Sequence, residues 1–274
     1  MPRCSGRSHS SGQITSGVEG NTGKVLGVAP KCIVTVTFFR RKVGHLLLPG
    51  RDLAGDVVVA DIGISESILQ EIKPKFFSNA PDFWMNEYPS LKAKYNKYSR
   101  GHAIVASGAE MTGAARLAST GARRIGAGVA TIVATGSSIN LHRADDPGNI
   151  VIRIDDKEAF QKFIDDSKKK AILVGPGCGI NKRTRDLTLA TLLSGVPTVL
   201  DADALSVFSV DPVNLFDSIK NGGPTVLTPH EGEYQRIFNF SGSKIRRSIQ
   251  ASEISGAVVL LKGSDTVISS PSGF

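Results

Sequence analysis

The sequence predicts an α/β fold built around a mostly parallel β-sheet. Four short apolar runs in the second half of the chain are each followed by a polar or glycine-rich loop, and they span Ala171–Val174, Thr198–Leu200, Thr225–Leu227 and Ala257–Leu261. The runs begin 27, 27 and 32 residues apart, with helix-like stretches between them. This spacing is typical of strand–crossover–strand units in a parallel sheet. Ligands bind such sheets beyond the carboxyl ends of the strands, so the four loops predict a site for a phosphate-bearing molecule.

The first third of the chain has a different texture. Residues 1–12 are rich in Ser, Gly and Arg, and we expect them to be disordered. A short helix is expected to open at Ser65–Ile68, and a proline-interrupted linker follows at residues 71–96. Before the helix, β-branched and apolar residues bounded by turn residues predict three short strands, at Ile33–Phe39, Leu46–Leu48 and Val57–Ile62.

A second domain is expected from residue 97 onward. Thr112–Ile125 predicts a helix, because small and apolar residues recur there at spacings of three and four, which allows close packing on a sheet. Further helices are expected at Asn181–Leu193 and Glu231–Phe238, and further strands at Ala103–Ser107, Val129–Ala134 and Val267–Ser269.

Composition restricts the classes of function. Hydrophobic residues make up 41% of the chain and charged residues 21%, which leaves ample material for a core. No run approaches the roughly 18–20 consecutive apolar residues needed to cross a bilayer, so we expect no membrane partner. The net charge is +8, but the basic residues are scattered and aromatics total 6%, which favours anionic metabolites over nucleic acid. Cys4, Cys32 and Cys178 lack metal-ligand spacing and are expected to be reduced thiols in the cytoplasm.

Two of the strand-end loops suggest contacts to a ligand. The Gly175–Gly179 loop precedes a helix, and its glycines would let a phosphate approach backbone N–H groups, although a ligand-free turn has the same composition. His230 follows a strand, where it could bind a ligand or transfer a proton near neutral pH. By itself this loop would suit a helix cap in which Glu231 and Glu233 complement the helix dipole. Beside three other polar strand ends, the ligand-binding interpretation is favoured.

The other two loops carry charged residues. Lys262–Thr266 follows the most apolar strand, and its Lys, flexible Gly and hydroxyl groups suit nucleotide phosphates, while they also suit a hairpin turn. Asp201 and Asp203 could hold Mg²⁺ through water or orient a neighbouring loop. A structural N-cap for Ala204–Phe208 is an equal alternative.

Together these loops resemble those of the ADP/ATP-dependent NAD(P)H-hydrate dehydratases, a ribokinase-like α/β family. The order and spacing of seven motifs carry the resemblance: Lys97–His102, Met111–Ala118, Gly126–Gly128, the Gly175–Gly179 loop, Asp201–Leu205, the His230 loop and Leu261–Thr266. The resemblance implies a three-layer sandwich with a mostly parallel central sheet over residues 97–274.

The resemblance also implies a reaction. The family restores NADH or NADPH that has been hydrated on the nicotinamide ring: ADP or ATP, with Mg²⁺, phosphorylates the added hydroxyl, and elimination follows. It places the hydrated cofactor against Ala114, Gly177 and His230. It places the nucleotide against Lys262, Gly263, Ser264, Asp265 and Thr266.

Residues 13–70 resemble the tail of the NAD(P)H-hydrate epimerase domain, which precedes the dehydratase in many bacteria. The matching motifs are Thr15–Gly23, Thr35–Phe39, Leu46–Arg51 and Val58–Gly63. Ser16 stands where the family helps to hold a potassium ion. Gln13 replaces the Asp of the family's Asp-Ile-Pro-Ser-Gly motif, so we expect a small remnant of a Rossmann-like domain without epimerase activity.

At the other end, the family continues to a Gly-Thr/Ser-Gly-Asp loop that supplies an anion hole and the general base, and these 274 residues do not contain that loop. We therefore expect a C-terminally incomplete dehydratase domain, whose general base lies beyond Phe274. Ser206, where the family usually has Asn, is a milder departure.

Three hypotheses follow. The chain is a hydrate dehydratase; or it is an inactive remnant that binds nucleotide weakly and gives no ADP-dependent turnover; or it is a small-molecule kinase of the hydroxyethylthiazole or hydroxymethylpyrimidine type. The kinase hypothesis fits the fold but does not predict the Lys97–His102 motif. Preference for ADP or ATP, and assembly into a homo-oligomer, are left open.

Overall fold

A computed structural model describes residues 10–89, 94–165 and 170–273. The chain divides into two compact units. The first contains the described residues up to Tyr88, and the second contains most of those from Pro89 to Gly273. The expected domain boundaries remain a prediction.

The first unit contains a three-stranded parallel sheet in the order β1-β2-β3. Its strands are β1 (Ser10–Gly12), β2 (Val34–Phe38) and β3 (Asp56–Ala60), and the 3₁₀ helix η1 (Val43–His45) and helix α1 (Gly50–Ala54) connect β2 to β3. The strands predicted around 33–39 and 57–62 are confirmed. The strand predicted at Leu46–Leu48 is wrong, because this segment lies between η1 and α1. It packs on the preceding loop, where a Cβ on Gly23 would lie 2.7 Å from the Leu47 oxygen.

Part of the predicted N-terminal disorder is also wrong. Residues 10–12 form β1, which pairs with Val34–Val36. Strand pairing uses backbone groups, so a Ser/Gly segment can join a sheet without an apolar pattern. Residues 1–9 lie outside the described part of the chain.

The segment after β3 is exposed. None of the described residues from 61 to 89 is buried. Three short helical pieces occur in it, α2 (Ile68–Ile72), α3 (Pro81–Trp84) and η2 (Met85–Glu87). The helix expected to open at Ser65–Ile68 is therefore present but begins at Ile68.

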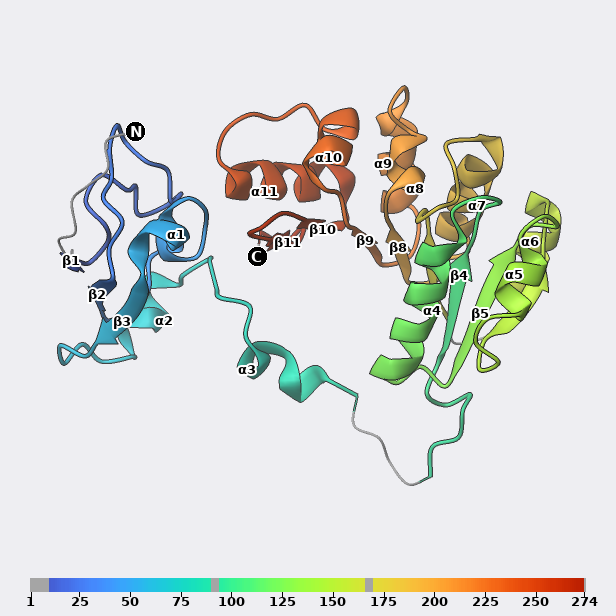
Figure 1. Cartoon of the computed structure of the whole chain (residues 1–274), viewed down its shortest axis with the longest axis horizontal. Coiled ribbons are helices and arrows are strands. Elements are labelled where there is room, and N and C mark those ends of the chain that lie inside the picture. The colour runs from blue at the N-terminus through green and yellow to red at the C-terminus, as the bar shows by residue number, and fades with distance from the viewer. Residues whose placement is uncertain (1–9, 90–93, 166–169, 274) are drawn as a thin grey trace. The chain divides into compact units, whose positions relative to one another are not determined.

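The second unit is built on an eight-stranded sheet in the order β11-β10-β9-β8-β7-β4-β5-β6 (Figure 1). All neighbours are parallel except β10 and β11, which form the expected hairpin. The strands are β4 (His102–Ala106), β5 (Val129–Ala134), β6 (Ile150–Arg153), β7 (Lys170–Val174), β8 (Thr198–Leu200), β9 (Thr225–Leu227), β10 (Val258–Leu261) and β11 (Val267–Ser269). The helices are α4 (Thr112–Ile125), α5 (Ile139–Arg143), α6 (Lys157–Asp165), α7 (Lys182–Leu193), α8 (Asp203–Ser206), α9 (Pro212–Lys220), α10 (Glu231–Ile237) and α11 (Lys244–Ser255).

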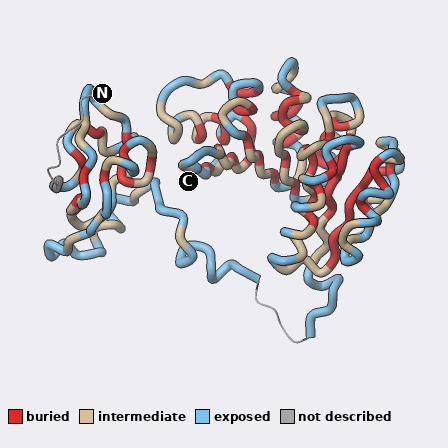
Figure 2. The backbone as a smooth tube through the Cα atoms, viewed as in Figure 1, coloured by how far each residue is buried: buried red, intermediate tan, exposed pale blue. Residues whose placement is uncertain are grey.

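This unit has three layers, because side chains along each strand point alternately to the two faces of the sheet and each face packs against helices. Ile104 and Ile172 face a large cluster that includes buried side chains of α6 to α11, whereas Val105 and Leu173, one residue further on, face a second cluster with Ala115 of α4. Successive strand residues point to opposite faces, so helices cover both faces of the sheet. Figure 2 shows the buried segments concentrated in these strands and in the inner sides of the helices.

Coverage of the second face is incomplete. The sheet register aligns Leu173, Val199, Val226 and Val258 in one row across β7 to β10. Each of these side chains is only partly buried. Along the same strands, Leu200 and Leu227 on the first face are fully buried.

No helix in the described residues is both long enough and apolar enough to cross a membrane.

Because Leu200 and Val199 lie on opposite faces of the sheet, substitutions at these two positions in β8 should lower the free energy of unfolding by different amounts. Leu200→Ala should lower the free energy of unfolding by about 2–5 kcal/mol, because it leaves a cavity in the main core. Val199→Ala, on the partly buried face, should cost about 1 kcal/mol or less. Chemical denaturation of the two variants measures this, and equal costs would contradict the assignment.

Candidate functional site

The four polar loops meet at one edge of the second unit's sheet. Strands β7, β8, β9 and β10 are adjacent and parallel, so their carboxyl ends lie at the same edge. Backbone pairing continues into the loops: the Asp201 N–H donates to the Val174 oxygen, the Thr228 N–H to the Leu200 oxygen and the Lys262 N–H to the Pro229 oxygen. The sequence-predicted convergence of these loops is therefore present.

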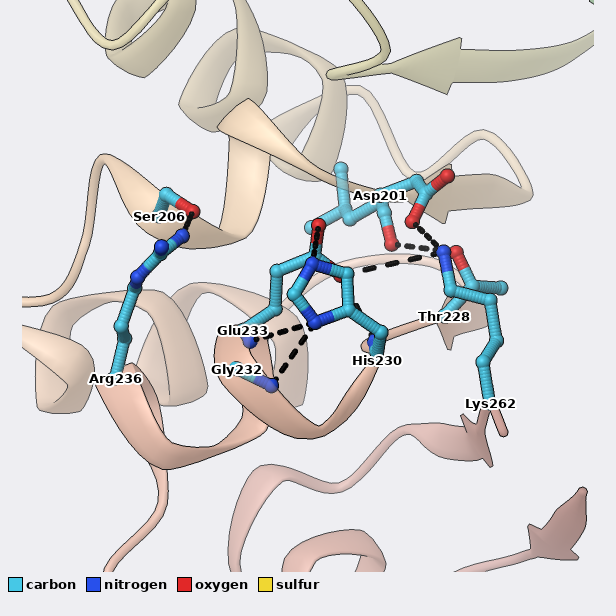
Figure 3. Close-up of polar contacts among 9 residues, drawn as sticks. Asp201, Ser206, Thr228, His230, Gly232, Glu233, Arg236 and Lys262 are labelled. Carbon is cyan, nitrogen blue, oxygen red and sulfur yellow. Dashed lines mark hydrogen bonds and ion pairs between the residues drawn. The ribbon is translucent and has the colours of Figure 1, made fainter. Parts of the chain in front are cut away.

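The side chain of Lys262 connects three of the strand ends. Its Nζ lies 2.7 Å from Asp201 Oδ1, after β8, and 4.0 Å from Glu233 Oε2, in the first turn of α10 (Figure 3). Lys262 is partly exposed, while the Glu233 side chain is 7% exposed. Two carboxylates thus face one ammonium group, and the cluster carries a net formal charge of −1.

His230 begins α10 as its N-cap residue. The ring atom Nδ1 accepts hydrogen bonds from the backbone N–H groups of Gly232 and Glu233, at 2.9 and 3.2 Å. The backbone N–H of His230 donates to Glu233 Oε2 at 2.9 Å. An Nδ1 that accepts cannot carry the proton of the neutral ring, so Nε2 carries it. Nε2 lies 3.2 Å from Glu233 Oε1.

The His230 loop therefore does cap a helix, but through the His230 ring and a capping box with Glu233, and this does not exclude ligand binding. Just over half of the His230 side chain is exposed. In this arrangement the exposed ring can donate from Nε2 to a ligand only by sharing the N–H with Glu233 Oε1 or by leaving it, whereas acting as a base would require a different tautomer or a turned ring.

Asp201 and Asp203 have separate partners. Asp201 pairs with Lys262, and Asp203 Oδ2 accepts a hydrogen bond of 2.8 Å from the Gly179 N–H. The N-cap position of α8 belongs to Ala202, and no side chain caps the helix there. The N-cap alternative is thus wrong, and Asp203 orients the neighbouring glycine loop instead.

Close backbone contacts fix the Gly175–Gly179 loop. A Cβ on Gly175 would lie 1.7 Å from the Asp201 oxygen, and one on Gly177 would lie 2.1 Å from the Met111 oxygen. Met111 immediately precedes α4, whose first turn contains the partly buried Ala114. The loop therefore lies between the start of α4 on one side and the Asp201–Lys262 pair on the other.

The predicted nucleotide-contacting residues form the connection between β10 and β11. Gly263, Ser264 and Thr266 are exposed, and Lys262 and Asp265 are partly exposed. The structure thus brings the positions expected to bind substrate and nucleotide to the same edge of one sheet. The individual roles of these residues remain predictions.

Ser16 belongs to the first unit. It is exposed, in the turn that follows β1. The potassium site expected there remains a prediction.

A buried polar pair lies at the carboxyl end of β4. The Ser107 hydroxyl, just after β4, is 2.9 Å from His142 Nε2 in α5, and both residues are buried. His142 Nδ1 has no hydrogen-bond partner among the described residues. Burial lowers the pKa of His142 below its usual value, and the nearby Arg116 lowers it further, against the opposing effect of Asp145.

In the glycine loop, burial raises the pKa of the Cys178 thiol, which makes it a structural rather than a reactive group.

Two charged residues were missed by the sequence reasoning. Glu233 was assigned to the helix dipole, although the spacing of His230 and Glu233 is that of a capping box. Arg183 of α7 donates to the Ser107 oxygen at 3.1 Å and to the Ile154 oxygen at 3.0 Å, which links the ends of β4 and β6. No sequence signal marks this role, because it depends on strands that are not neighbours along the chain.

Comparison with protein families identifies related proteins. A family model described as NAD(P)H-hydrate dehydratase matches residues 103–274. The bifunctional NAD(P)H-hydrate repair enzymes Nnr of Thermofilum pendens and Moorella thermoacetica are each 31% identical to the chain, over 276 and 281 residues. Both matches cover 95% of this chain and 51% of the relative, so the chain spans about half the length of these curated relatives.

Solved structures show the same fold. The ADP/ATP-dependent NAD(P)H-hydrate dehydratase of Bacillus subtilis, co-crystallized with ATP/Mg²⁺, is 28% identical with a TM-score of 0.57, and the match covers 69% of each chain. A ribokinase-like superfamily protein of Enterococcus faecalis, 19% identical, has a TM-score of 0.58 and covers 69% of this chain and 67% of its own. The expected ribokinase-like α/β fold is confirmed.

Gly175 lies so close to the Asp201 backbone that Gly175→Ala should destabilise the protein. The new Cβ would overlap the Asp201 oxygen, and the backbone φ of +127° disfavours any other residue. We expect the free energy of unfolding to fall by roughly 2–5 kcal/mol. Gly121→Ala is the control, because it lies in α4 with open space around it and should raise stability by about 0.5–1 kcal/mol. A destabilisation no larger than about 1 kcal/mol in the Gly175 variant would contradict the packing.

The lowered pKa of His142 predicts a loss of stability in mild acid. As the pH falls through about 6.5, the unfolded chain takes up a proton on this residue that the folded chain does not, so folding becomes less favourable. Chemical denaturation as a function of pH measures the slope, and His142→Gln should reduce it. If the slope is the same in that variant, His142 does not contribute to the pH dependence of the free energy of unfolding.

Proposed function

The chain belongs to the NAD(P)H-hydrate dehydratase family, and on this premise we propose that it acts in the nucleotide-dependent repair of hydrated NADH or NADPH. In this reaction ADP or ATP phosphorylates the hydroxyl that hydration has added to the nicotinamide ring, and elimination of the phosphate restores the reduced cofactor. The observation that carries the proposal is the convergence of Asp201, Glu233 and Lys262 beside the glycine loop.

In the proposal, the β10–β11 connection receives the nucleotide. The exposed Gly263 and Ser264 leave the backbone of the turn accessible, and the Lys262 ammonium can neutralise part of the phosphate charge. Lys262 is already held by Asp201, so phosphate binding requires either that the ammonium be shared or that another cation take its place beside the carboxylates.

Mg²⁺ fits the latter role. Asp201 and Glu233 offer oxygen atoms, which Mg²⁺ prefers, and the negative formal charge of the cluster favours a further cation. No group of three or more His, Cys, Asp or Glu residues suited to a metal occurs in the described residues. Mg²⁺ is commonly held by one or two carboxylates together with the substrate's phosphates, so two carboxylates suffice for it to arrive with the nucleotide.

The substrate side of the proposed site lies across the glycine loop. The partly buried Ala114 and the loop glycine Gly177, which packs against the Met111 backbone, would form the wall of the site that faces the hydrated nicotinamide ring. In the proposal, His230 donates from Nε2 to the substrate and shares this N–H with Glu233 Oε1.

Binding of MgADP tests the proposal, because the groups proposed to hold the nucleotide and the metal (Lys262, Asp201 and Glu233) all lie in the described part of the chain. Lys262→Ala should weaken MgADP binding by at least about tenfold, since a charge-assisted contact to phosphate is lost. Lys162→Ala, an exposed lysine on α6, is the control and should bind as the unaltered chain does. Isothermal titration calorimetry gives the affinities for MgADP and MgATP.

The same titrations define failure of the proposal. If the unaltered chain binds neither nucleotide, or if the Lys262 and Lys162 variants bind equally well, the assigned site is wrong. Recovery of NADH absorbance from hydrated NADH in the presence of nucleotide then measures turnover separately from binding.

A further inference from the structure

We propose that Arg236 is a positioning residue, which ties α10 to α8 and thereby sets the spacing of the Asp201 and Glu233 carboxylates on either side of Lys262. This inference rests on the proposed function, because it concerns the affinity of that site for Mg–nucleotide. Its basis is a second connection between the same two segments that Lys262 joins.

The connection is a single hydrogen bond. Arg236 Nη1 donates to Ser206 Oγ over 2.8 Å (Figure 3). Ser206 ends α8 and is 4% exposed, while Arg236 is an exposed residue of the last turn of α10. The guanidinium therefore reaches from the surface to a buried acceptor on the neighbouring helix.

The two connections are close to each other along the chain. Arg236 follows Glu233 by three residues, which places both side chains on the same side of α10. Ser206 follows Asp201 by five residues, at the other end of α8. Lys262 and Arg236 thus hold the α8 and α10 segments at two separate points, which restricts the rotation of one segment against the other.

Apolar packing also joins the helices, because Leu205 of α8 and Tyr234 of α10 belong to the same buried cluster. The hydrogen bond adds a contact with a defined direction. A hydrogen bond from a charged donor is directional. One partner of this hydrogen bond is exposed, so its contribution to overall stability is expected to be modest, and its loss should appear more strongly in ligand affinity than in the melting temperature.

Ser206 has a defined part in this arrangement. Its hydroxyl accepts from Arg236, and Asn, with its carbonyl oxygen, would also accept. Ser206→Asn should therefore preserve the connection, whereas Ser206→Ala removes the acceptor.

The test compares MgADP affinity in Arg236→Met, Ser206→Ala and the double variant. Each single variant should weaken binding by at least about fivefold, and the double variant should bind no worse than Arg236→Met alone, as expected for two residues that act through one bond. Arg124→Met is the matched control, because Arg124 is an exposed arginine near the end of α4. All variants should melt within about 4 °C of that control, since a single hydrogen bond of this kind contributes modestly to stability.

Amide hydrogen exchange of α8 gives a second measurement that needs no ligand. Arg236→Met should speed exchange in α8 relative to Arg124→Met, and Ser206→Asn should not. The inference is overturned if MgADP affinity is unchanged in both single variants, if weaker binding is accompanied by a fall in melting temperature beyond about 4 °C, or if α8 exchanges equally in the Arg236 and Arg124 variants. If the unaltered chain binds no MgADP, the proposed function fails, and exchange alone then decides whether Arg236 holds α8.

Discussion

The position of the Lys262 ammonium between Asp201 and Glu233 is the interaction on which the site depends. These residues come from three different strand ends, and only a parallel arrangement of β8, β9 and β10 brings them together. The glycine loop is tied to the same group, because Gly175 packs directly on the Asp201 backbone and Gly179 donates to Asp203. A change in the register of one of these strands would therefore disturb every part of the site.

The central architecture could be predicted because its signals are local and agree with each other. The strands at Val129–Ala134, Thr198–Leu200 and Thr225–Leu227 and the helix at Thr112–Ile125 have the predicted bounds. In each case an apolar or amphipathic period is bounded by turn residues, so propensity and burial favour the same structure. Parallel pairing then follows from the crossover lengths, and the location of the site follows from parallel pairing.

Most of the failures arose where tertiary contacts decided the outcome. Leu46–Leu48 has a strand-like composition but packs on a loop. Residues 10–12 look disordered by composition yet pair with β2. In the site, of the alternatives given for Asp203, the orientation of a neighbouring loop is the one observed, since Asp203 accepts from Gly179. Glu233 was assigned to the helix dipole, but it accepts a hydrogen bond from the His230 backbone N–H in a local capping box. Short polar segments offer several local options of similar free energy, and their partners from distant segments select among them.

A crystal structure of the chain in complex with MgADP would show directly where the nucleotide and the metal bind. We expect the diphosphate to lie against the β10–β11 turn, with the metal near Asp201 and Glu233 and with Lys262 within hydrogen-bonding distance of a phosphate or of Asp201. A nucleotide bound elsewhere on the chain, or a Lys262 ammonium remote from both carboxylates and from the phosphates, would contradict it.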